Sequence, residues 1–154
     1  MLPLIDPRRP NLLRSSRAYN AIWIGLAALL TGLHAVIVLE AAGHRLPVTS
    51  LLTGATGVLF MVIGNYLPKF RSNWFAGLRT PWTLSSERSW LRSHRLAGRL
   101  FVALGLLILL LAPFASNQVQ IVTLVAGLAL VTAVTVTYSW WVWRTDPTRH
   151  SLGR

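Results

Sequence analysis

The 154-residue chain contains no cysteine and few charged residues, and both features narrow its chemistry. Without cysteine the chain has no disulfides and no thiolate ligands for a metal ion. Charged residues make up 12% of the chain and hydrophobic residues 53%, with a mean hydropathy of +0.52. Because a soluble domain carries about 25% charged residues, the composition excludes an ordinary soluble globule. It predicts a protein whose surroundings are mostly lipid.

Carboxylates are scarce too, since 4 Asp and Glu stand against 15 Lys and Arg, for a formal net charge of +11. Four basic residues precede the first long apolar run, seven lie between the second and third, and three follow the fourth. The remaining basic residue, Arg45, lies in the connection between the first and second runs. This is the distribution of the positive-inside rule, so both termini are predicted to be cytosolic. The basic charge then indicates attraction to anionic lipid headgroups and no direct nucleic-acid binding.

Four apolar runs are candidate membrane spans, at residues 21–41, 51–67, 96–112 and 119–143. Each approaches the roughly 20 residues that cross a hydrocarbon core of about 30 Å. We therefore predict an all-α integral membrane four-helix bundle, N-in/C-in, with a structured basic cytosolic loop between the second and third helices. Its parts are a cytosolic N-terminal segment (1–20), a four-span membrane domain (21–143) and a cytosolic tail (144–154).

Small residues mark where the helices can approach one another. In the first run they recur at helical spacing on one face, at Gly25, Ala28, Gly32 and Ala35. Such a stripe lets a neighbouring helix pack closely in lipid, within the chain or in a homo-oligomer. Gly54, Ala55 and Gly57 could do the same in the second run. A Ser or Thr among residues 48–50 is expected to cap that second helix.

Between the second and third runs, tryptophan, arginine and proline are concentrated in a polar segment. Pro81 is expected to hold Thr80 extended and to fix a turn that keeps Arg79 near Trp82. Asn65, at the end of the second span, needs partners on another helix or among the carbonyls that Pro68 leaves unpaired.

The third helix is predicted to begin before the membrane, with Ser85 or Ser86 as its cap and Glu87 in its first turn. Glu87 is the only acid in this basic loop, so it is expected to order several arginines. Trp90 and His94 fall on one face of this helix. A second face carries a basic stripe of Arg88, Arg92, Arg95 and Arg99.

The segment resembles the core motif of the SdpI family of bacterial membrane immunity proteins. The resemblance is carried by Gly64-Asn65-Tyr66-Leu67-Pro68-Lys69, Arg79-Thr80-Pro81-Trp82-Thr83-Leu84, Ser86-Glu87, Trp90 and His94-Arg95. It implies a multi-pass protein of the bacterial inner membrane that protects the cell from a membrane-active peptide toxin. It also implies signalling through capture of a cytosolic repressor protein. Many relatives carry a further N-terminal hydrophobic region, which we expect this chain to lack because Asp6 comes almost at its start.

On this resemblance the loop motif is the candidate binding site for a peptide toxin or a protein partner. Its residues are Asn65, Pro68, Lys69, Asn73, Gly77, Arg79, Thr80, Pro81, Trp82, Thr83, Glu87, Trp90, His94 and Arg95. The alternative is a folded interfacial loop that only anchors the helix ends. An enzyme is not predicted: Ser85, Ser86, Glu87 and His94 are residue types of a hydrolase, but a second carboxylate, a nucleophile elbow and a metal motif are missing. No cofactor is expected.

Ionisable residues within the apolar runs leave a second function open. His34 lies about two-thirds along the first run and Glu40 near its outer end. Intramembrane ionisable groups often mark ion or proton paths, although histidine is readily kept neutral. The alternative function is therefore a small, oligomeric membrane transporter or channel component. A proton-coupled route would require His34 to face a polar path.

Overall fold

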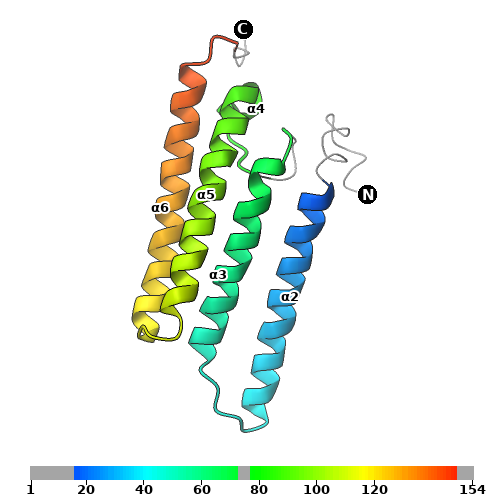
Figure 1. Cartoon of the computed structure of the whole chain (residues 1–154), viewed down its shortest axis with the longest axis vertical. Helices are drawn as coiled ribbons and strands as arrows, with labels where there is room; N and C mark the ends of the chain where they lie inside the picture. Colours follow the sequence, from blue (N-terminus) through cyan, green and yellow to red (C-terminus); the bar gives the residue numbers. More distant parts are fainter. Residues whose placement is uncertain (1–15, 73–76, 149–154) are drawn as a thin grey trace.

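The computed structural model describes residues 16–72 and 77–148, and within them every regular element is helical. Four long helices run alternately up and down: α2 (Ser16–Ala41), α3 (Val48–Tyr66), α5 (Glu87–Leu111) and α6 (Asn117–Arg144) (Figure 1). A 3₁₀ turn, η2 (Leu67–Lys69), and a short helix, α4 (Pro81–Ser85), lie between α3 and α5. All four long helices are long and apolar enough to span a membrane, which confirms the predicted all-α class.

The N-terminal ends of α5 and α3 test the helix caps that were predicted from the local sequence. The Ser86 side chain caps α5 by accepting a hydrogen bond from the Ser89 N–H (2.9 Å), so this helix begins well before its apolar part, as predicted. The expected Ser or Thr cap on α3 is wrong, because Pro47 occupies the cap position and no side chain bonds there. Ser50 lies within the helix, and its hydroxyl instead accepts from the side chain of Gln120 (3.1 Å).

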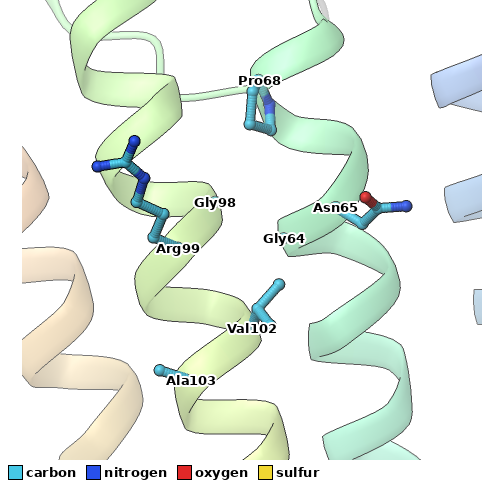
Figure 2. A pocket seen from close by; sticks show the side chains of 7 residues that line it. All are labelled: Gly64, Asn65, Pro68, Gly98, Arg99, Val102 and Ala103. Carbon is cyan, nitrogen blue, oxygen red and sulfur yellow. The ribbon is translucent and has the colours of Figure 1, made fainter.

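α3 and α5 pack against each other through paired glycines. A methyl group added at Gly64 would lie 2.6 Å from the carbonyl oxygen of Gly98, and one added at Gly57 would lie 2.8 Å from that of Gly105. Figure 2 shows Gly64 and Gly98 on the facing sides of the two helices. In both helices the glycines are seven residues, or about two turns, apart, so the two contacts lie on one line of closest approach. We call Gly57–Gly105 and Gly64–Gly98 the glycine pairs.

α2 contacts the bundle mainly through α3 and lies beside it, away from α6 (Figure 1). A methyl group at Gly25 would lie 3.1 Å from Leu59 of α3, whereas one at Gly32 would meet nothing within 4 Å. Of the two glycines in the small-residue stripe of α2, only Gly25 therefore packs closely against another helix. His34 is exposed on the surface of α2.

Candidate functional site

The sequence motif folds at one end of the bundle, close to the C-terminal end of α6 (Figure 1). We call this the motif end. Thr80 is extended (φ −105°, ψ 160°), as predicted because Pro81 follows it. Thr80 also caps α4, a short helix that the sequence interpretation did not predict. The Thr83 N–H donates to the Thr80 hydroxyl (3.2 Å), and the Thr80 N–H donates back to the Thr83 hydroxyl (2.8 Å). This reciprocal pair is a capping box, which fixes the short helix locally.

Trp82 attaches α4 to α6. Its indole Nε1–H donates to the hydroxyl of Ser139, which lies on α6. Ser89 of α5 donates to the backbone carbonyl of the same Ser139 (2.7 Å) and is fully buried. One residue of α6 therefore receives bonds from both elements that follow the loop.

Trp90 and His94 form the buried centre of the motif, with exposed fractions of 0% and 1%. Their rings stack at 4.1 Å between centroids with an angle of 22° between planes, so the predicted shared face is confirmed. Trp90 Nε1–H donates to the carbonyl of Phe70 (2.9 Å). The ring nitrogen Nδ1 of His94 lies 2.8 Å from the Trp90 carbonyl, and Nε2 accepts from the Leu78 N–H (3.1 Å). One nitrogen donates and the other accepts, as in a neutral imidazole.

Gly77 completes this contact. It has a positive φ (99°), and a methyl group added there would overlap Nε2 of His94. Only glycine fits both the backbone conformation and the space beneath the ring. We call Gly77, Leu78, Trp90 and His94 the histidine latch, because they fasten the chain before α4 to α5.

Asp146, just beyond α6, is a site residue that the sequence interpretation missed. Its carboxylate accepts from the Ser86 hydroxyl and from the N–H (3.0 Å) and hydroxyl (2.8 Å) of Thr148. The Ser86 bond is the main cause that lowers the pKa of Asp146, and the charge of Arg88 adds to it. A lowered carboxyl pKa stabilises the fold above the usual value near about 4. This contribution is lost as the pH falls through the lowered pKa.

Glu87 does not order the surrounding arginines as the sequence suggested. It is exposed in the first turn of α5, and within residues 16–72 and 77–148 it forms no ion pair. The buried carboxylate that acts on this region is Asp146, about sixty residues away in the chain. Sequence spacing gave no signal for that contact, because it depends on where α6 ends against α5.

Asn65 also departs from expectation. It is exposed at the end of α3, and within the described part of the chain its amide has no hydrogen-bond partner. Leu67–Lys69 form a 3₁₀ turn, in which the Phe70 N–H donates to the Leu67 carbonyl (3.3 Å). Backbone groups thus complete the helix end without the Asn65 side chain.

The structure sorts the predicted site residues by exposure. The buried ones are Thr83, Trp90 and His94, and the half-buried ones are Pro68, Thr80 and Trp82. Asn65, Lys69, Gly77, Arg79, Pro81, Glu87 and Arg95 are exposed, and Asn73 lies outside the described residues. The buried members hold the motif end together, and the exposed members lie on its surface.

The serines near His94 do not form a nucleophile–base pair with it. The Ser85 hydroxyl lies 3.4 Å from the Trp82 carbonyl, and the Ser86 hydroxyl donates to Asp146. Both ring nitrogens of His94 are already bonded to backbone groups. The Ser86 hydroxyl and the imidazole of His94 are thus bonded within the fold.

Comparison with known proteins agrees with the motif. Residues 69–139 match the model of the SdpI/YfhL protein family. The chain is similar to the "Immunity protein SdpI" of Bacillus subtilis (strain 168), with 28% identity over 100 residues. The matched part is 64% of this chain and 48% of the relative, so the chain spans about half the length of that protein. No solved structure matches the chain. With its four membrane-capable helices, the chain is a multi-pass membrane protein that is similar to the SdpI family over residues 69–139.

Proposed function

We propose that this protein is an SdpI-like immunity protein of the bacterial inner membrane that protects the cell from a membrane-active peptide toxin. The observation that carries the proposal is the similarity to the "Immunity protein SdpI", together with the family match over residues 69–139. The loop motif of the candidate site lies partly within that match. The exposed surface of α2 supports a toxin contact within the bilayer, since its apolar side chains such as Ile24 and Ile37 are unpacked.

A finer part of the proposal is that the motif end recruits a cytosolic repressor protein when toxin is engaged. The histidine latch and the Asp146 contacts support this idea, because they hold an exposed set of basic residues in one place. Arg92 and Arg95 are exposed on α5, and within the described residues neither has an ion-pair partner. Such a surface suits an acidic patch on a soluble partner.

We also propose the N-in/C-in topology, because basic residues predominate at the motif end. The chain has no native cysteine, so single cysteines can report sidedness without background. Cysteines replacing the exposed residues Ala42 and Phe114 are expected to react with an impermeant thiol reagent in intact cells. One replacing the exposed Lys69 is expected to react only after the membrane is opened. Labelling of the Lys69 position in intact cells would contradict the topology.

The immunity proposal predicts that expression of this chain in a strain killed by a membrane-active peptide toxin restores growth. His34→Leu is expected to keep the resistance, because His34 is exposed on α2 and helix contacts, not proton passage, provide protection. Growth at increasing toxin concentration is the measurement, with membrane amounts matched by a fluorescent tag.

Two controls separate the parts of the proposal. Arg95→Glu is expected to leave resistance unchanged but abolish membrane recruitment of the repressor, whereas Arg45→Glu at the opposite end changes neither. The immunity proposal fails if no toxin gives a phenotype and proteoliposomes show a proton or solute flux that His34→Leu removes. In that case the transporter alternative replaces it.

A further inference from the structure

A groove opens between α3 and α5 near the motif end, with a volume of about 380 Å³. Its floor is the close crossing of Gly64 and Gly98. Pro68, Val102 and Ala103 form its apolar walls, and Asn65 adds a polar side chain on the α3 side. Figure 2 shows this groove between the two helices, with the Arg99 side chain at its α5 edge. Its volume lies within the range of about 300–1,000 Å³ typical of ligand pockets. Because the glycines lack side chains, the crossing that brings the helices together also leaves a hollow.

Arg99 lies at a depth where an unpaired cation is costly. It is twelve residues from the far end of α5, about 18 Å in a membrane core of about 30 Å. Helical side chains tilt toward the helix N-terminus, which for α5 is the motif end. Figure 2 shows the guanidinium displaced in that direction. The Arg99 side chain therefore reaches from hydrocarbon toward the headgroup layer.

The described part of the chain offers Arg99 no counter-charge. Arg99 is exposed, and within residues 16–72 and 77–148 it has no hydrogen bond or ion pair. Of the described carboxylates, Glu87 lies about 18 Å away along the same helix. Asp146 lies beyond the end of α6, and Glu40 near the opposite end of α2 (Figure 1). A charge at membrane depth is normally paired or hydrogen-bonded, so an external anion is expected here.

We propose that this groove binds one anionic phospholipid of the leaflet at the motif end. The lipid phosphate pairs with the Arg99 guanidinium, whose planar donors match phosphate oxygens. An acyl chain lies over the glycine floor between Pro68 and Val102. The chemistry selects this occupant, because an apolar trough with a single cation at its edge fits an amphiphilic anion. A free phosphate would use the cation alone, and a zwitterionic lipid would present a cation of its own near Arg99.

Native mass spectrometry of the purified protein in detergent tests the site, with phosphatidylglycerol or phosphatidylcholine added at equal amounts. The parent protein is expected to retain phosphatidylglycerol preferentially. Arg99→Gln is expected to reduce that preference about tenfold, the scale of one lost charge-assisted bond. Arg88→Gln removes the same charge from the same stripe about 16 Å away, and it is expected to retain lipid as the parent does.

A second variant tests the groove apart from the charge. Ala103→Phe fills the apolar wall but keeps Arg99, and it is expected to lose phosphatidylglycerol retention as well. If Arg99→Gln fails to fold, Ala103→Phe and the charge-keeping Arg99→Lys decide the matter. Equal retention by Ala103→Phe and the parent would overturn the proposal, since headgroup contact alone would then explain it. Competition by inorganic phosphate, equal binding of phosphatidylcholine, or a second copy of the chain in place of lipid would overturn it too.

Discussion

Replacing Gly64 with alanine is expected to destabilise the protein strongly, because the added methyl group would collide with backbone atoms of α5. The new Cβ would lie 2.6 Å from the Gly98 carbonyl oxygen and 2.8 Å from the backbone nitrogen of Val102. Backbone atoms cannot rotate away as a flexible side chain can, so α3 and α5 must separate. Overpacking of this kind costs about 1–3 kcal/mol, and more where backbone is displaced. Unfolding in detergent, followed by circular dichroism against rising denaturant, measures the loss.

Gly32→Ala is the matched control, because it adds the same methyl group to another helix where nothing lies within 4 Å. Alanine is the better helix former by up to about 1 kcal/mol, so this variant is expected to be as stable as the parent or slightly more so. If Gly64→Ala and Gly32→Ala unfold at the same denaturant concentration, the glycine pairs do not set the packing of α3 on α5.

Replacing His94 with leucine is expected to release the chain between α3 and α4 from α5. The change removes the acceptor for the Leu78 N–H and the aromatic partner of Trp90. A buried donor left without a partner costs about 1–3 kcal/mol, and the poorer fit of leucine adds to this. We therefore expect a lower thermal midpoint in detergent and faster protease cleavage between Phe70 and Pro81.

His44→Leu is the control for His94, since His44 is exposed and lies at the opposite end of the bundle. Surface substitutions of this kind change stability by less than about 0.5 kcal/mol. Gly77→Ala is expected to disrupt the histidine latch as well, because Gly77 has a positive φ and the added methyl group would overlap the His94 imidazole. Combined with His94→Leu it is expected to cost less than the sum of the two changes. Full additivity would mean that Gly77 and His94 do not act as one unit.

The number and approximate extent of the long helices follow from the sequence, because each apolar run is continuous and ends near a strong signal. The cap at Ser86 with Glu87 in the first turn placed the start of α5 correctly, since that signal is local. The cap of α3 was misjudged for a tertiary reason. Ser50 bonds to Gln120, seventy residues later in the chain, and a local pattern cannot reveal such a partner.

At the motif end, the sequence predicted one packing contact but not the hydrogen bonds. Spacing put Trp90 and His94 on one face, and the structure stacks them. It could not show that the ring of His94 bonds to Leu78 across the loop, or that Asp146 returns to Ser86 from the end of α6. These contacts join residues whose separation depends on how the helices pack. The same holds for the pairing of Gly64 with Gly98, which is visible only once their helices are placed side by side.

The glycine pairs impose a rule on chain length. Both contacts are preserved only while the segment from Gly57 to Gly64 and the segment from Gly98 to Gly105 contain equal numbers of residues. Inserting one residue into either segment would turn one glycine of a pair by about 100° around its helix and leave a larger side chain in its place. The turn between α5 and α6, at residues 112–116, carries no such constraint from the glycine pairs. Length variation among natural relatives is thus expected to avoid these two segments.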